Sequence, residues 1–266
     1  MRRLELLIGE NQSWSKAGRE LGFQCVCLDW SARCAPDLCM DVRDFWSEGH
    51  GHFDVVCASP DCRELSQARR VDQKKGNEEF ADSVGQACVS IIQFHVARGA
   101  VGILENPQQA LPKRPWMAQY AHLSSVVDYC MWSGPRPADF DGSSPSKLNL
   151  GDWHPARKPT SIYVFGGPTV WQPSRARCKL LSGSCGFCDE RGAHICWSRH
   201  CGDRRQIEVC RARGYPHVFS TAELHRIPSA LCRELLEHAA ACVASGREER
   251  ERDAAVPGVQ GDAADE

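Results

Sequence analysis

Short apolar runs alternate with amphipathic segments along the first 110 residues. Four runs are apolar and compact enough to predict buried strands. They lie at 4–8, 25–29, 53–59 and 101–107. Apolar residues recur at helical spacing over 13–21, before Gly22, and over 80–96. The order strand, helix, strand, strand, helix, strand predicts an α/β fold with a doubly wound, mostly parallel sheet.

The later part of the chain is less regular. The segments 125–132 and 160–167 alternate apolar and polar residues, which predicts strands near an edge of the sheet. Between them, 134–159 is rich in Pro, Gly, Ser and Asp and predicts a long loop. An amphipathic helix is expected over 230–243. We therefore divide the chain into a core (1–167), a small basic Cys/His-rich lobe (168–225), a closing helix of the core (226–245) and a disordered tail (246–266).

Composition and charge limit the function. The 266 residues carry a formal charge of −2, which argues against a generally basic nucleic-acid binder. Local basic segments nevertheless suit a polyanion: 171–213 holds nine Lys/Arg against four Asp/Glu. No apolar run approaches a membrane span, and the N-terminal one is too short for a secretory signal. We expect an intracellular protein, monomeric, without a membrane partner, whose 16 cysteines are reduced.

The first strands offer features that suit a nucleotide-like cofactor. The chain turns through Gly9 into a helix whose N-terminal amides attract negative groups. Asp29 ends the second predicted strand, where a carboxylate can accept hydrogen bonds from ribose hydroxyls. Asp41 and Val42 could offer a carboxylate and an apolar wall to an adenine. An ordinary cap or turn is the alternative explanation for each acid.

The stretch FDVVCASPDCRELS, residues 53–66, contains the strongest catalytic candidate. Its apolar run stops at Ser59 and Pro60, because proline cannot donate to a strand ladder. Cys62 follows directly, at the carboxyl end of a strand, where α/β sheets bind their ligands. A buried structural thiol is the alternative interpretation.

Several stretches occur in a fixed order over residues 4–236. They read LELLIGENQSWSKAGRELG, CLDW, CMDVRDF, FDVVCASPDCRELS, GILENPQ, DYC, ARKPTSIYV and HRIPSALCRELL. In these stretches the chain resembles the DNA (cytosine-5) methyltransferase family, and among its members the small phage-type methylases. The pair of Ser-Pro-x-Cys at one strand end and Glu-Asn-Pro at the next is the most discriminating feature.

The resemblance implies a reaction and its residues. Cys62 would attack carbon 6 of a cytosine in DNA, so that carbon 5 takes the methyl group of S-adenosylmethionine. Glu105 would hold the cytosine ring nitrogen and amino group, and Arg157 or Lys158 would place a cation near the attacked base. Because the reacting carbons are stacked inside duplex DNA, the base would have to be flipped out.

The resemblance also implies the cofactor pocket. Its residues would come from the first turn, the second and third strand ends, the catalytic loop and the closing segment. They are Gly9, Asn11, Ser13, Asp29, Asp41, Val42, Ser59, Pro60 and Ile227.

The chain departs from the family pattern at two places. The first turn reads Gly9-Glu10-Asn11-Gln12 where the family has Gly-x-Gly, and Asp61 stands where the family has proline. A carboxylate beside the nucleophile raises the pKa of a thiol. Two alternatives therefore stay open: a degenerate member that binds nucleic acid or a partner without turnover, and an RNA cytosine methyltransferase. An amino-directed methyltransferase fits less well, because Ser59-Pro60-Asp61-Cys62 lacks the Asp/Asn-Pro-Pro-aromatic pattern.

Residues 178–201 form a cluster of possible metal ligands. Cys185 and Cys188 make a C-x₂-C pair, with Cys178 seven residues before it and His194 six residues after it. Three cysteines and a histidine can close a tetrahedral structural zinc site in a segment with little apolar content of its own. These four are the first choice among seven candidate ligands, since Cys196, His200 and Cys201 follow in the same segment. A loop of free cysteines is the alternative.

Overall fold

The protein is described here by a computed structural model covering residues 3–8, 12–62, 77–108, 110–135, 152–153, 157–179, 185, 187–188 and 226–255. One seven-stranded sheet crosses this described part, in the order β3-β2-β1-β4-β5-β7-β6. The strands are β1 (Arg3–Ile8), β2 (Gln24–Asp29), β3 (Leu38–Cys39), β4 (Val55–Ser59), β5 (Val101–Pro107), β6 (Ser124–Asp128) and β7 (Pro159–Phe165). β1 to β5 run parallel, and β7 runs antiparallel to β5 and β6. The predicted α/β class with a mostly parallel sheet is confirmed.

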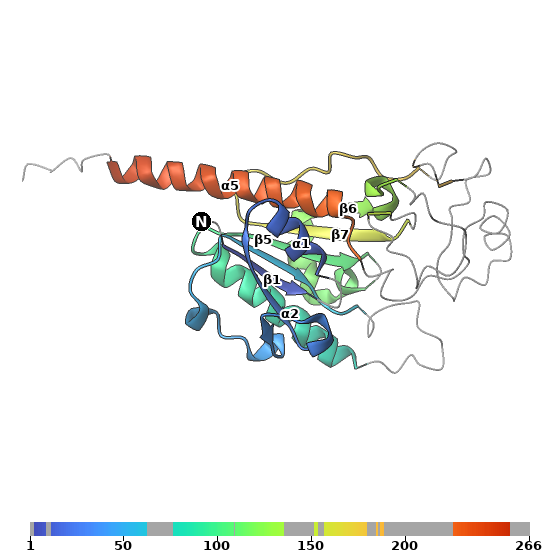
Figure 1. The fold of residues 1–266 in the computed structure, drawn as a ribbon, viewed down its shortest axis with the longest axis horizontal. Coiled ribbons are helices and arrows are strands. Elements are labelled where there is room, and N and C mark those ends of the chain that lie inside the picture. Colours follow the sequence, from blue (N-terminus) through green and yellow to red (C-terminus); the bar gives the residue numbers. More distant parts are fainter. Residues whose placement is uncertain are drawn as a thin grey trace, which may run out of the picture.

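Three helices cover the sheet: α1 (Ser13–Glu20), α2 (Glu78–Val96) and α5 (Ser229–Ala255). Figure 1 shows α1 and α5 above the sheet and α2 below it. Side chains alternate between these layers: Cys57 packs with α1 and α5, whereas its neighbour Val56 packs with α2. Both faces of β4 are therefore buried, which explains why its sequence is continuously apolar.

Short 3₁₀ helices fill most of the remaining connections. They are η1 (Ala32–Cys34), η2 (Val42–Asp44), η3 (Ser47–His50), η5 (Leu111–Lys113), η6 (Pro115–Leu123) and η7 (Tyr129–Trp132). We expected a strand over 125–132, but β6 ends at Asp128 and η7 follows it. The partner of Asp128 is Pro159, and beyond this pair the amide of Tyr129 donates to the carbonyl of Arg157, one residue out of register with the ladder. The side chain of Asp128 accepts from the amide of Cys178 in the loop after β7.

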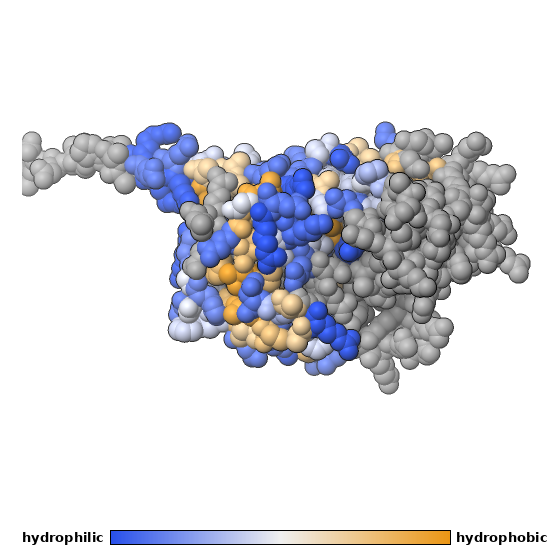
Figure 2. Space-filling model, in the orientation of Figure 1, coloured by the Kyte–Doolittle hydropathy of each residue, from blue (hydrophilic) through white to orange (hydrophobic). Residues whose placement is uncertain are grey.

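The closing helix is longer than the sequence predicts. We expected a helix ending near residue 245 and a disordered tail from 246, but α5 continues to Ala255. Gly246 does not adopt the positive φ of a glycine that ends a helix, and the Glu, Arg and Ala residues after it are good helix formers. Arg247 also forms an ion pair with Asp54. Figure 2 shows this far end of α5 as a hydrophilic surface.

Several predictions fall outside the described residues. They concern Gly9, Asn11, His194, most of the 134–159 loop and most of the 168–225 lobe. Among the helices that are described, none combines the length and the apolar character needed to cross a bilayer.

Candidate functional site

The candidate site lies where β4 and β5 end side by side. The two strands are parallel and in register up to Ala58 opposite Leu104. Glu105 is the next residue of β5 and is 4% exposed, and Cys62 follows β4 by three residues. Cys62 is half-buried. The fold therefore brings the predicted nucleophile and the predicted acid to one edge of the sheet.

Hydrogen bonds fix the loop that carries Cys62. The indole nitrogen of Trp14 donates to Ser59 Oγ at 3.1 Å. Asn106 Nδ2 donates to the carbonyl of Pro60 at 2.9 Å, and Asn106 Oδ1 accepts from the amide of Leu111 at 3.1 Å. Asn106 is buried, so these bonds are shielded from water. The Asn of Glu-Asn-Pro thus ties the end of β5 to the loop after β4.

Glu105 is held by two residues that flank the antiparallel strands, Tyr129 just after β6 and Lys158 just before β7. The hydroxyl of Tyr129 donates to Glu105 Oε1 at 2.6 Å, and Lys158 Nζ lies 4.0 Å from the same oxygen. Lys158 also lies over the Tyr129 ring, 4.7 Å from its centroid. Burial, and then the charge of Glu105, raise the pKa of Tyr129 well above its usual range, so the phenol stays protonated and able to donate.

The ionisation of Cys62 depends on the same groups. Burial is the largest cause that raises the pKa of this thiol, to about 11. The positive charge of Lys158 lowers that pKa, and the negative charges of Glu105 and then Asp61 raise it. Asp61, which departs from the family pattern, raises the pKa of Cys62 less than burial does. The thiol is therefore mostly protonated at neutral pH, and Lys158 is the group that favours the thiolate.

Arg157 occupies a different position from Lys158. Its Nε lies 3.2 Å from Asp128 Oδ1, and Asp128 is fully buried. Arg177 also contacts Asp128, with its Nε 3.1 Å from Oδ2 and its Nη2 3.2 Å from Oδ1. Of the two cations that the resemblance offered, Lys158 contacts Glu105, whereas Arg157 contacts Asp128.

On the cofactor side, two predicted acids lie at the ends of β2 and β3. Asp29 is buried and its Oδ1 accepts from the amide of Ser31 at 2.7 Å. Asp41 caps η2, and the guanidinium of Arg43 binds its carboxylate at 2.9 and 2.6 Å. These bonds hold the pKa of Asp41 below its usual value, so it is ionised but already engaged. Val42 packs against the core on the α2 face.

The first turn and the closing segment meet at the start of α1. Gln12 precedes α1 in a left-handed conformation, with φ of 45°. Ser13 Oγ accepts from the amide of Ile227 at 3.2 Å, although the two residues are 214 positions apart. The structure therefore brings together Ser13 and Ile227, two members of the predicted cofactor set.

Sequence reasoning assigned no role to three residues of this region. Trp30 follows Asp29 and is 69% exposed, which is unusual for so large an apolar side chain. The quoted stretch CLDW contains this tryptophan, so its position after a strand-end acid was a readable signal. Tyr129 lies in the quoted stretch DYC, but only the fold shows that it reaches Glu105. Cys130 lies 48 residues before Cys178, so no local spacing links them.

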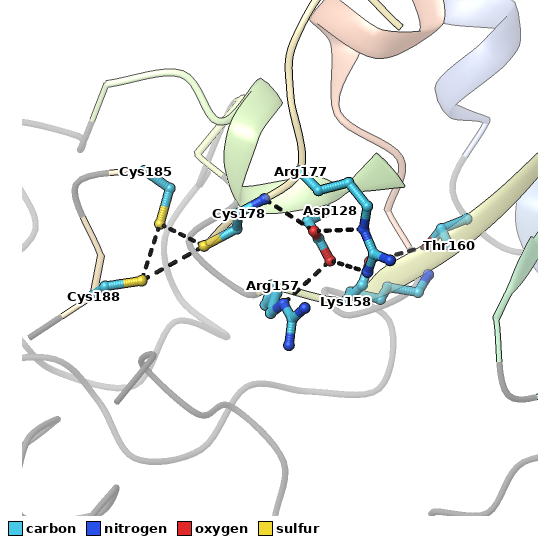
Figure 3. A network of polar contacts seen from close by, with 8 residues as sticks. All are labelled: Asp128, Arg157, Lys158, Thr160, Arg177, Cys178, Cys185 and Cys188. Atoms are coloured by element: carbon cyan, nitrogen blue, oxygen red, sulfur yellow. Dashed lines mark hydrogen bonds and ion pairs between the residues drawn. The ribbon is translucent and has the colours of Figure 1, made fainter. Parts of the chain in front are cut away.

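The cysteine cluster forms beside this site (Figure 3). Cys178 Sγ lies 3.5 Å from the sulfurs of Cys185 and Cys188, and those two sulfurs are 3.6 Å apart. Cys130, in η7, places its sulfur within 4.8 Å of those of Cys178 and Cys185. Burial, and then Cys185 and Cys178, raise the pKa of Cys130. Three of the four predicted ligands are therefore together, with a cysteine from the core among them.

Comparison with known proteins gives weak structural similarity and no match to a family. None of the protein-family models and none of the curated proteins compared with this chain matches it. Among solved structures, the crystal structure of the S. pombe Dnmt2 methyltransferase is similar, with a TM-score of 0.38 and 9% sequence identity. The match covers 65% of this chain and 53% of that chain, about half its length. A similarity this weak does not establish an activity.

Proposed function

We propose that this protein transfers a methyl group from S-adenosylmethionine to carbon 5 of cytosine in DNA, at the carboxyl edge of a doubly wound sheet. The observation that carries the proposal is the placement of Cys62 and Glu105 at neighbouring strand ends, with Lys158 reaching Glu105. A sulfur nucleophile beside a buried carboxylate and a cation suits addition to an electron-poor ring.

Each of these groups has a defined task. The Cys62 thiolate forms a bond to carbon 6 of cytosine, and the former carbon 5–carbon 6 double bond supplies the electron pair that takes the methyl group. The methyl donor would leave as S-adenosylhomocysteine. Transfer of the carbon 5 proton to water then restores the double bond and expels the thiolate. Glu105, fixed by Tyr129, would hold the ring nitrogen and the amino group of the base. Lys158 favours the thiolate and balances the carboxylate.

The residues at the ends of β2 and β3 fit an adenosine group. Asp29 offers a buried carboxylate to ribose hydroxyls, and the exposed indole of Trp30 beside it offers a flat apolar surface to the adenine ring. Val42 would add an apolar contact. Bound S-adenosylmethionine would supply an electrophilic methyl group on a sulfonium.

DNA is the proposed partner, with cytosine as the base that this chemistry would modify. The target would leave the helix to reach Cys62. The basic balance of 171–213 suits contacts to phosphates, which position a protein on DNA without reading its sequence.

The test is transfer of tritiated methyl groups to unmodified DNA, with base analysis of the product. We expect label in 5-methylcytosine, its loss in Cys62→Ser, and its retention in the control Cys39→Ser, because Cys39 is exposed on β3. DNA containing 5-fluorocytosine adds a second readout, because fluorine cannot leave carbon 5 as the proton does. A covalent protein–DNA adduct should then accumulate. Undiminished methylation by Cys62→Ser would show that Cys62 is not the nucleophile.

Binding and methylation assays with the same protein test two alternative functions. Asp61 and the glycine-poor turn Gly9-Glu10-Asn11-Gln12 favour a non-catalytic protein of this fold that binds nucleic acid or a partner, and calorimetry with S-adenosylmethionine would then show no binding. Parallel assays with labelled DNA and RNA decide between the two substrates, since a cysteine nucleophile suits cytosine in either.

A further inference from the structure

Four cysteines from three separate segments gather beside β6. Cys130 comes from η7, Cys178 from the loop after β7, and Cys185 and Cys188 from the C-x₂-C pair. The sulfur of Cys178 lies 3.5 Å from those of Cys185 and Cys188, and the latter two sulfurs are 3.6 Å apart. A tetrahedral zinc site with Zn–S bonds of about 2.3 Å places its sulfurs about 3.8 Å apart. A disulfide would need about 2.0 Å, so these sulfurs are spaced for a shared metal rather than for a bond.

We propose that Cys130, Cys178, Cys185 and Cys188 bind one structural zinc ion, and that the fourth ligand comes from the core rather than from His194. Four thiolates select zinc among the common divalent ions, because magnesium and calcium prefer oxygen ligands. Cys130, within 4.8 Å of two of the other sulfurs, needs only a shift on the scale of a side-chain rotation. This inference does not depend on the proposed methyl transfer.

Asp128 supports the geometry of this cluster. Its Oδ2 accepts from the backbone amide of Cys178 at 3.0 Å, which orients a ligand through the main chain. The same buried carboxylate is paired with Arg157 and Arg177, so its charge is balanced where water cannot reach it (Figure 3). Outer partners of this kind orient the ligands of a metal site.

Three consecutive residues then connect the metal site to the candidate catalytic site. Asp128 orients Cys178, Tyr129 donates to Glu105, and Cys130 joins the sulfur cluster. A zinc ion bound through Cys130 would clamp the segment after β7 to the end of β6. It would thereby hold the backbone that carries Tyr129.

The first experiment measures zinc in the full-length protein purified without chelator. We expect one zinc per chain by elemental analysis, and an intense thiolate-to-metal absorption after replacement by Co²⁺. In Cys130→Ser, zinc affinity measured by chelator competition should fall by about 100-fold or more, since even outer-shell changes can cost that much. Cys88→Ser is the matched control, because Cys88 is about as buried as Cys130 but lies in α2, away from the cluster. Its zinc affinity should not change.

A second measurement keeps the test valid if Cys130→Ser does not fold. In the wild-type protein, bound zinc should protect Cys130, Cys178, Cys185 and Cys188 from alkylation, and a chelator should expose all four together. Three results would overturn the proposal. They are a folded full-length protein without stoichiometric zinc, alkylation of Cys130 at one rate with and without metal, and loss of zinc in His194→Ala while Cys130→Ser retains it.

Discussion

At the scale of single residues, the pKa of Cys62 decides how reactive the site is before substrate binds. With a pKa of about 11, its alkylation rate should rise about tenfold per pH unit between pH 7 and 10, because only the thiolate reacts. Asp61→Asn removes a charge that raises this pKa, so it should speed alkylation at pH 8 a few-fold. Mass spectrometry of the Cys62 peptide measures both effects. A pH-independent rate, or no change in Asp61→Asn, would contradict the assigned electrostatics.

Lys158 and Arg157 offer a matched pair of adjacent cations with different contacts. Lys158→Gln removes the charge that lowers the pKa of Cys62, so adduct formation with 5-fluorocytosine DNA should slow by about tenfold or more. Arg157→Gln instead removes one of the two guanidinium partners of buried Asp128, so its main effect should be a lower melting temperature. If both variants slow adduct formation equally and are equally stable, Lys158 and Arg157 do not have these separate roles.

At the scale of elements, the apolar periodicity of the sequence predicted the strands and helices in which one pattern of buried and exposed positions continues along the whole element. β4 and α2 are examples, because each repeats a single pattern from end to end. The end of β6 was not predictable, because it depends on the shifted bond from Tyr129 to Arg157 and on the loop bound by Asp128. For the site, Cys62 and Glu105 could be predicted from strand ends. The contacts of Tyr129, Lys158 and Cys130 could not, since they depend on how antiparallel β7 and β6 are placed.

An ion pair connects the last turns of α5 to the core. Arg247 forms an ion pair with Asp54, which is 5% exposed and also lies 3.6 Å from His52. Arg247→Ala should lower the free energy of unfolding by about 1 kcal/mol, the upper part of the range for exposed pairs, because Arg247 itself is half exposed. Urea denaturation measures this change. Arg252→Ala, at an exposed position of the same helix, is the control, and equal effects in both would remove the assigned role of the pair.

At the scale of the whole molecule, the chain returns to its beginning to complete the site. The segment before α5 bonds to Ser13 through Ile227, and Arg233 of α5 forms an ion pair with Glu20 of α1. The proposed cofactor residues and the proposed nucleophile thus lie on one edge of the sheet formed by β1 to β5. Opposite them, β7 and β6 bring Lys158 and Tyr129. In the proposed reaction, a cytosine that contacts both groups would first have to leave the base stack.

Flipping the cytosine out of the helix would cost free energy, and that cost depends on the base opposite the target. Once methylation has mapped a target site, the guanine opposite the target cytosine can be replaced by a base that pairs poorly with it. Because a mismatched base costs less to flip, the modified duplex should bind about tenfold more tightly or better than the matched one. Cys62→Ser should keep this preference, since flipping precedes the attack by sulfur. The same mismatch moved several base pairs away is the control, and fluorescence anisotropy measures each dissociation constant. Equal affinities for the target and displaced mismatches would mean that the base stays in the helix, and Cys62 could then not reach carbon 6.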